Sequence, residues 1–221
     1  FYGTIQSALF TLIAVYATSM NFSILEISIV TFLLAVSGAV AQFPIGKISD
    51  IYDRRKVIVF STFGAAIFSI LTIIVSRQMY LPDGLATSKT WFYIFFILFS
   101  FCSLPMFSLI LAHTNDYIAK EKFVAAGAGL QFIFGFGAIS GPFLCSIIMD
   151  FFGSNGFFIF LFFFHSLIGI YGIYRMKIRP TVDNPDSQFV AMPQTITPAG
   201  IELNPTTEPI EEPIKEEDKI N

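Results

Sequence analysis

Six long intervals without a charged residue make up most of this 221-residue chain. They run over residues 1–25, 27–46, 57–76, 90–115, 123–149 and 151–174. Each interval holds 20 residues or more, and an α-helix needs about 20 residues to cross the hydrocarbon core of a bilayer. Barrel strands do not fit, because they alternate in polarity over about ten residues. The pattern predicts an all-α, polytopic membrane protein.

The composition points the same way. Hydrophobic residues make up 54% of the chain and charged residues only 13%, about half the proportion of charge found in soluble domains. A water-soluble domain with so little charge could not cover its surface. The chain is therefore expected to be embedded in a bilayer.

We predict one transmembrane helix in each interval. The six predicted spans lie at about residues 3–20, 25–46, 57–76, 91–112, 124–148 and 156–174. Turn-forming residues separate several of them, at 21–23, 82–84 and 153–156. Residues 1–179 are thus predicted to form one six-helix bundle.

The last part of the chain has a different character. Residues 180–221 hold nine acidic and two basic residues, together with seven of the 11 prolines, whereas residues 1–179 hold 11 basic and seven acidic residues. Such a segment has too little apolar surface to fold alone. We predict an acidic, Pro-rich, disordered tail over residues 180–221.

Basic residues fall mainly on one side of the predicted spans. Nine share one side, namely Lys47, Arg54, Arg55, Lys56, Lys120, Lys122, Arg175, Lys177 and Arg179. Only Arg77 and Lys89 lie on the other side. The positive-inside rule then places the N-terminus, the basic loops and the tail in the cytoplasm. The expected location is a multi-pass position in the bacterial inner membrane.

Residues 46–56 carry the most specific pattern, Gly-Lys-Ile-Ser-Asp-Ile-Tyr-Asp-Arg-Arg-Lys. Gly46 allows two helices to approach closely where the chain leaves the membrane. Asp50 follows one helical turn later and can meet a basic partner or a helix N-terminus. The basic triplet at 54–56 is suited to the cytoplasmic leaflet.

This loop resembles the signature Gly-x-x-x-Asp-Arg/Lys-x-Gly-Arg-Arg/Lys-Arg/Lys of the major facilitator superfamily. The positions that match are Gly46, Asp50, Arg54, Arg55 and Lys56. Two positions depart, since Ile51 replaces a basic residue and Asp53 replaces a glycine. The alternative interpretation is a positive-inside cluster with a coincidental Gly and Asp.

The resemblance implies half of a secondary transporter with two six-helix halves that moves a small solute by alternating access. The chain starts at Phe1 rather than at Met and has no signal-peptide features, and its sixth span leads into the tail. We therefore interpret it as a fragment, the C-terminal half. Asp50 is then expected to latch the cytoplasmic face against the missing N-terminal half, with Arg54 as its ion-pair partner.

The fifth predicted span is rich in glycine before a proline. It holds Gly127, Gly129, Gly135, Gly137, Gly141 and then Pro142. The GxxxG pair Gly137 and Gly141 favours tight helix packing, and the Gly-Pro step also fits a hinge. The span resembles the Gly-Pro-rich fifth helix of antiporter-type members, in repeat position only.

Few polar side chains fall at membrane depth. Gln6, Tyr16 and Gln131 are candidates for cavity lining, because the resemblance implies that the first and fifth helices of each half line the pathway. Hydrogen bonds between helices are the alternative. His113 or Asp116 could relay a proton, but Asp116 fits a cap or loop ion pair better, and His165 fits a packing or hydrogen-bonding role.

Several function classes are excluded by what the sequence lacks. Cys102 and Cys145 lie in apolar runs and are read as buried, and two histidines do not make a metal cluster. No nucleophile–base pair, Walker loop or basic nucleic-acid-binding stripe is present, so we expect no enzyme, no cofactor, no metal and no nucleic-acid partner. The expected partners are a small solute, a coupling proton, the other half and lipid. The alternative function is a self-associating six-span channel or pore.

Overall fold

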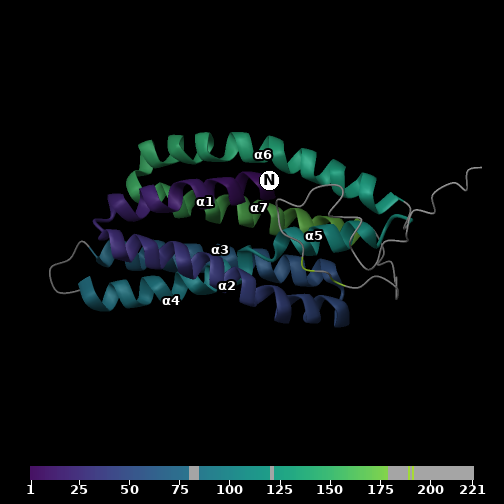
Figure 1. The fold of residues 1–221 in the computed structure, drawn as a ribbon, viewed down its shortest axis with the longest axis horizontal. Coiled ribbons are helices and arrows are strands. Elements are labelled where there is room, and N and C mark those ends of the chain that lie inside the picture. Colours follow the sequence, from purple (N-terminus) through teal and green to yellow (C-terminus); the bar gives the residue numbers. More distant parts are fainter. Residues whose placement is uncertain (80–84, 120–121, 179–188, 190, 192–221) are drawn as a thin grey trace, which may run out of the picture.

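The computed structural model describes residues 1–79, 85–119, 122–178, 189 and 191, and within these ranges every regular element is helical. The elements are α1 (Tyr2–Ser19), α2 (Ile24–Ile51), α3 (Arg54–Gln78), α4 (Leu85–Ser103), α5 (Met106–Asn115), α6 (Phe123–Phe152), the short η2 (Gly153–Asn155) and α7 (Gly156–Ile178). The helices run roughly along one axis and form an elongated bundle (Figure 1). This is the all-α architecture that the charge-free intervals predict.

Four helical stretches among the described residues are long and apolar enough to cross a membrane. They are Ile24–Ile51, Arg54–Gln78, Thr87–Asn115 and the 56-residue stretch Phe123–Ile178, which contains both α6 and α7. Helix α1 is not one of the four, because Thr4, Gln6 and Ser7 make its first turns more polar. The chain is thus a multi-pass helical membrane protein, while the count of six spans stays a prediction.

The fourth predicted span, 91–112, is not one uninterrupted helix. Helix α4 ends at Ser103, and α5 begins at Met106, with Leu104 and Pro105 between them. Proline has no backbone N–H and its ring collides with the preceding helical turn, so the helix breaks where Pro105 enters. Proline alone does not force a break, since α2 contains Pro44 and α6 contains Pro142 without interruption.

Helix α2 extends further than its predicted end at residue 46. It continues to Ile51, so most of the signature segment is helical and only Tyr52 and Asp53 link α2 to α3. At its other end, α2 starts with a capping box in which the Ser23 side chain accepts from the Glu26 N–H and Glu26 accepts from the Ser23 N–H. The capping box thereby satisfies two backbone N–H groups that have no partner within the helix.

Helices α1 and α6 approach each other closely, and glycines make this approach possible. A Cβ atom added to Gly137 would lie 2.7 Å from the Thr4 nitrogen, and one added to Gly141 would collide with the Thr4 carbonyl oxygen. From the other side, a Cβ at Gly3 would collide with the carbonyl oxygen of Phe134. The two backbones therefore touch directly, as small residues permit in membranes.

An aromatic cluster fills the core between α1, α4 and α7. Tyr16 is fully buried, with its ring 5.3 Å from that of Phe157, 5.0 Å from that of Phe158 and 6.0 Å from that of Phe92. Its hydroxyl also lies 2.6 Å from the hydroxyl of Ser76 on α3. Side chains from four helices thus meet at Tyr16, and the hydroxyl of Tyr16 has a hydrogen-bond partner.

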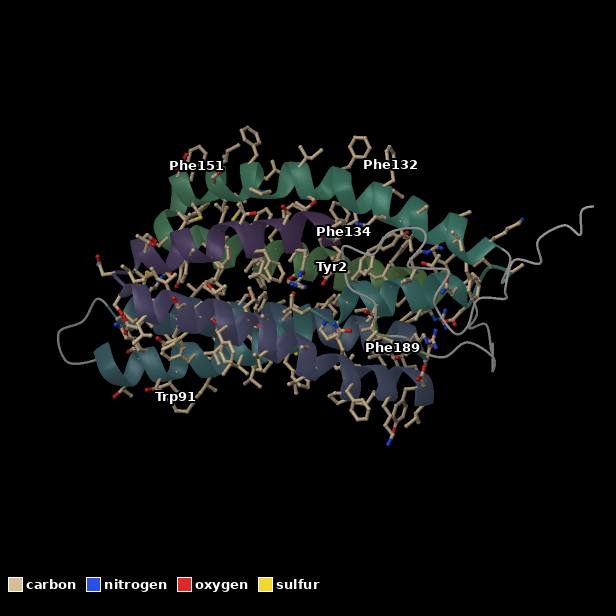
Figure 2. The ribbon with its side chains drawn as sticks, viewed as in Figure 1. Tyr2, Trp91, Phe132, Phe134, Phe151 and Phe189 are labelled. Atoms are coloured by element: carbon tan, nitrogen blue, oxygen red, sulfur yellow. The ribbon has the colours of Figure 1, made fainter. Side chains whose placement is uncertain are left out.

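One long face of α6 carries large apolar side chains that no described residue covers. Phe132 and Phe151 point away from the bundle (Figure 2). The same helix exposes Ile133, Phe136, Ile139 and Phe143. A surface of this kind requires lipid or another protein against it.

The glycine contact between α1 and α6 gives a first prediction. Replacing Gly141 with Ala pushes a methyl group into the Thr4 carbonyl, and we expect about 1–3 kcal/mol of destabilisation, the usual cost of overpacking. Thermal unfolding of the detergent-solubilised protein, followed by circular dichroism at the helical band, measures this effect. Gly135→Ala on the same helix is the control, because nothing lies within 4 Å of its Cβ position. Equal melting temperatures for the two variants would contradict the packing role.

Candidate functional site

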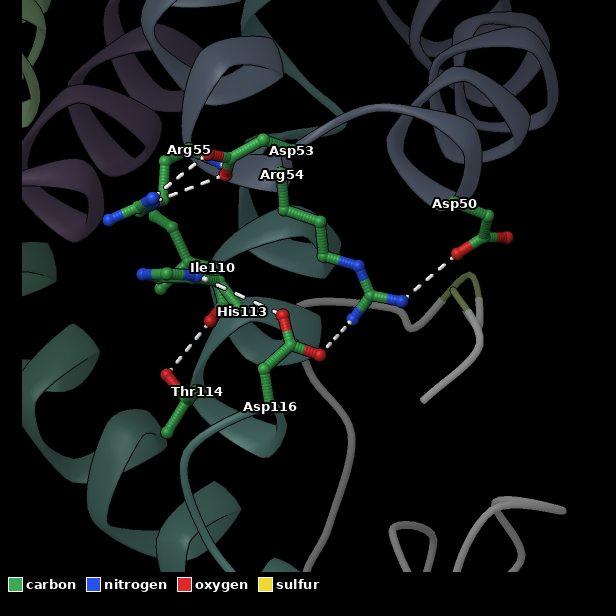
Figure 3. A network of polar contacts seen from close by, with 8 residues as sticks. All are labelled: Asp50, Asp53, Arg54, Arg55, Ile110, His113, Thr114 and Asp116. Carbon is green, nitrogen blue, oxygen red and sulfur yellow. Dashed lines mark hydrogen bonds and ion pairs between the residues drawn. The ribbon is translucent and has the colours of Figure 1, made fainter. Parts of the chain in front are cut away.

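Asp50, Asp53, Arg54 and Arg55 of the signature segment belong to a network of polar contacts (Figure 3). Arg54, the first residue of α3, lies at its centre. Its Nη2 donates to Asp50 Oδ1 at 3.0 Å and its Nη1 to Asp116 Oδ1 at 2.9 Å. The predicted Asp50–Arg54 ion pair is present, and one guanidinium joins the end of α2, the start of α3 and the residue that follows α5.

Burial distinguishes the two ion pairs of Arg54. The Arg54 side chain is only 7% exposed and Asp116 13%, whereas Asp50 is 37% exposed. Exposed pairs contribute about 0–1 kcal/mol, while removing one partner of a buried pair leaves a costly unpaired charge. The Arg54–Asp116 pair therefore holds the network together, and the Asp50 carboxylate remains accessible to a further partner.

Asp53 stands where the superfamily signature has glycine, and its side chain caps a helix and pairs with an arginine. Its Oδ1 accepts from the backbone N–H of Arg55 and so caps α3. Its two carboxylate oxygens also accept from Arg55 Nε at 3.1 Å and Nη2 at 2.9 Å. Burial alone would raise the pKa of Asp53, but the hydrogen bonds from Arg55 outweigh it and hold the pKa below its usual value.

Gly46 lies under an aromatic ring rather than under another helix of the bundle. A Cβ atom at Gly46 would collide with the ring of Phe189. The backbone N–H of Phe189 also donates to Asp50 Oδ1 at 2.8 Å. The two signature residues Gly46 and Asp50 therefore offer a groove for an aromatic group beside a carboxylate acceptor (Figure 2 labels Phe189).

His113 and Asp116 belong to the same network. Asp116 follows α5 and pairs with Arg54, which makes it a loop ion pair rather than a helix N-cap. His113 Nδ1 lies 3.9 Å from Asp116 Oδ2, and the imidazole ring packs edge-on to Tyr117 with the ring centres 5.1 Å apart. The proton relay considered for these residues stays a prediction.

The break between α4 and α5 holds a second polar cluster, deep in the bundle. The Tyr2 hydroxyl lies 3.1 Å from the carbonyl oxygens of both Ser103 and Leu104, which the break leaves without their usual helical partners. The Ser103 hydroxyl lies 3.0 Å from His165 Nε2, and His165 is fully buried. One tyrosine from α1 and one histidine from α7 thus stabilise the ends of the interrupted helix.

The candidates for cavity lining are not brought together. Tyr16 lies inside the aromatic cluster, and Gln6 is only 2% exposed on α1. Neither side-chain polar atom of Gln6 has a hydrogen-bond partner in the described part of the chain, and the same holds for Gln131 Oε1. Buried amides without partners are costly, and cavity lining by Gln6 and Gln131 stays a prediction.

Two of the side chains in these clusters were not among the sequence candidates. Tyr2 was missed because nothing in the local sequence links it to Ser103 and Leu104, which lie 101 and 102 positions further along the chain. Asp53 was read only as a departure from the signature, although an Asp directly before a helix start is a common N-cap. Pro105, inside the fourth charge-free interval, was the available signal for the helix break.

The long apolar helices, the charged network and the helix interrupted at a proline are features of a polytopic helical membrane protein. The sequence profile of the Major Facilitator Superfamily matches residues 1–210. The chain belongs to this superfamily.

Individual relatives are distant. The chain is 24% identical over 190 residues to an uncharacterised MFS-type transporter of Yersinia enterocolitica, covering 86% of this chain and 44% of the relative. It is 31% identical over 139 residues to the riboflavin transporter MCH5 of Saccharomyces cerevisiae, covering 62% of this chain and 25% of the relative. An uncharacterised MFS-type transporter of Bacillus subtilis, YfkF, is 26% identical over 165 residues, covering 72% of this chain and 38% of the relative. The chain thus spans less than half the length of each of these relatives.

The helix break gives the second prediction. Tyr2→Phe removes the hydroxyl that bonds to the Ser103 and Leu104 carbonyls, and we expect a loss of about 1–2 kcal/mol in unfolding free energy, typical of a buried hydrogen bond. Chemical unfolding of the solubilised protein measures it. Tyr174→Phe, at an exposed position of α7, is the matched control and should change stability by less than about 0.5 kcal/mol. A Tyr2 variant as stable as this control would contradict the assigned role.

Proposed function

We propose that this chain is the C-terminal six-helix half of a secondary transporter that moves a small solute by alternating access. The six helices of the half are α1, α2, α3, the interrupted pair α4–α5, α6 and α7. The N-terminal half is the expected partner. The network centred on Arg54 carries the proposal, since it unites the signature residues Asp50 and Arg54 in the geometry that a cytoplasmic latch requires.

The accessibility of Asp50 supports a latch. Arg54 is shared with the more buried Asp116, so it positions the Asp50 carboxylate without enclosing it. The backbone N–H of Phe189 already bonds to this carboxylate, which shows that it can accept from a main-chain donor. A backbone N–H at a helix N-terminus of the other half would satisfy Asp50 in the same way.

The uncovered surface of α6 supports a missing half. Its exposed residues include Phe132, Phe136 and Ile139, and α2 likewise exposes Phe32, Val40 and Phe43. The chain also spans only 25–44% of the three relatives. A second bundle packed against α2 and α6 would bury these side chains.

We further propose that the network end faces the cytoplasm. Arg54, Arg55 and Lys56 at the start of α3 lie at the same end of the bundle as Arg175 and Lys177 at the end of α7 (Figure 1). The opposite end carries the Glu26–Lys89 ion pair, with a distance of 2.6 Å. This distribution follows the positive-inside rule. The bacterial inner membrane stays a prediction, because the relatives come from bacteria and from yeast.

The proposed latch gives the third prediction. In the full-length transporter, Asp50→Asn should lower transport by about tenfold, a coupling of the usual size between distant parts of a protein, while membrane insertion stays intact. Riboflavin is the first radiolabelled probe to test, because one relative is a riboflavin transporter. Membrane fractionation and immunoblotting report the insertion.

A second readout does not depend on knowing the solute. In a background with Cys102 and Cys145 replaced by Ser, a cysteine at Gln42 on α2 reports access to the cytoplasmic face through its rate of maleimide labelling. Asp50→Asn should raise that rate because the latch is released. Asp150→Asn, which removes an exposed carboxylate at the far end of α6, is the control. Unchanged labelling and transport in the Asp50 variant would count against the latch.

A further inference from the structure

A small cavity opens beside the charged network, between the ends of α3, α5 and α7. Its volume is about 280 Å³, slightly below the roughly 300 Å³ of the smallest sites for drug-sized ligands. It is lined by Arg55, His113, Thr114, Tyr117, Ile118 and Arg175. The size suits a compact polar group better than an extended solute.

The charge of the lining is positive. Among the described residues, two guanidinium groups, Arg55 and Arg175, border the cavity, and no carboxylate does. Two nearby carboxylates are already paired, Asp53 with Arg55 itself and Asp116 with Arg54. Arg175 forms no ion pair with any residue that the structure describes. An anion in the cavity would therefore meet the charge of Arg175, which no described carboxylate pairs with.

The lining is also held in position before any ligand arrives. Asp53 bonds to both Nε and Nη2 of Arg55, which fixes the plane of that guanidinium. Thr114 is anchored by its hydroxyl, which donates to the Ile110 carbonyl at 2.8 Å. Because Asp53 occupies the Nε–Nη2 edge, Arg55 contributes a fixed positive charge, and Arg175 is the guanidinium suited to contact phosphate oxygens directly.

The position of Arg175 connects the cavity with the membrane surface. It lies in the last turn of α7, directly after the exposed aromatic residues Tyr171 and Tyr174, which are each 58% exposed. Tyrosines at such positions lie at the level of the lipid headgroups. Basic pockets between helices on the cytoplasmic side are suited to anionic headgroups.

We propose that this cavity binds a phosphate-bearing anion, with Arg175 and Arg55 as its charged contacts and Tyr117 as a hydroxyl neighbour. An anionic phospholipid headgroup and a free phosphate share this chemistry. The site is distinct from the groove at Gly46 and Asp50, which is lined by a different set of residues.

Native mass spectrometry of the purified full chain tests the proposal. The probes are phosphatidylglycerol, the zwitterionic phosphatidylcholine and inorganic phosphate, each titrated separately and the phosphate also against bound phosphatidylglycerol. We expect preference for phosphatidylglycerol over phosphatidylcholine, and an affinity loss of about tenfold in Arg175→Gln, as for a lost hydrogen bond to a charged group. Arg175→Lys should retain part of the binding, because it keeps the charge without the planar fork.

Lys177→Gln is the matched control, because it removes the same charge two residues away at an exposed position outside the cavity. It should leave affinity nearly unchanged, and both glutamine variants should unfold at the temperature of the parent protein. Tight binding of inorganic phosphate with no preference for phosphatidylglycerol would support the site and assign it to a soluble anion.

Three outcomes would overturn the proposal. The first is an equal loss in the Arg175 and Lys177 variants, which would indicate general surface charge. The second is equal binding of phosphatidylglycerol and phosphatidylcholine with no binding of phosphate. The third is phosphatidylglycerol binding that appears only after the nine acidic residues of 180–221 are replaced by amides, since the occupant would then be the chain's own carboxylates.

Discussion

Every backbone N–H and C=O group inside a bilayer needs a partner within the protein, and this requirement shapes the whole molecule. It explains why the described residues of the body are helical almost throughout, and why each interruption is supplied with its own hydrogen bonds. At the break before Pro105, Tyr2 bonds to the carbonyls of Ser103 and Leu104. Asp53 likewise caps the start of α3 next to the linker from α2.

These hydrogen bonds at helix ends also bring distant parts of the chain together. Tyr2 connects the start of α1 to the middle of the fourth predicted span, and His165 connects α7 to the same place through Ser103. Arg54 connects α2, α3 and the end of α5. The polar groups that complete one helix end therefore also fix how the helices are arranged, and the proposed latch and anion site both rest on that arrangement.

Much of the architecture could be predicted from the sequence because charge is excluded from the hydrocarbon. The positions of the charged residues alone give approximate limits for all the long helices, and the signature loop indicates the superfamily. The spacing of Asp50 and Arg54 predicts their ion pair, since residues four apart share a helix face. The extension of α2 to Ile51 was not predicted, because a charged residue ends a charge-free interval without ending a helix.

The contacts between residues far apart in the chain could not be predicted from the sequence. Nothing in the sequence near Tyr2 says that its hydroxyl meets a helix break, and nothing near Tyr16 says that three phenylalanines surround it. Pro44 and Pro142 lie within continuous helices while Pro105 interrupts one, so a proline alone does not decide the outcome. Tertiary packing decides it, through the partners available to the carbonyls that a break releases.

The glycine contact between α1 and α6 has a mechanical consequence. Most helix pairs interlock through ridges of side chains that fit into grooves, so an axial displacement must lift each ridge over the next. Where Gly137 and Gly141 lie against the backbone around Thr4, there are no such ridges to climb. The two helices are in backbone contact there, without interlocking side chains. A small axial shift of one helix along the other therefore requires little side-chain repacking at these glycines.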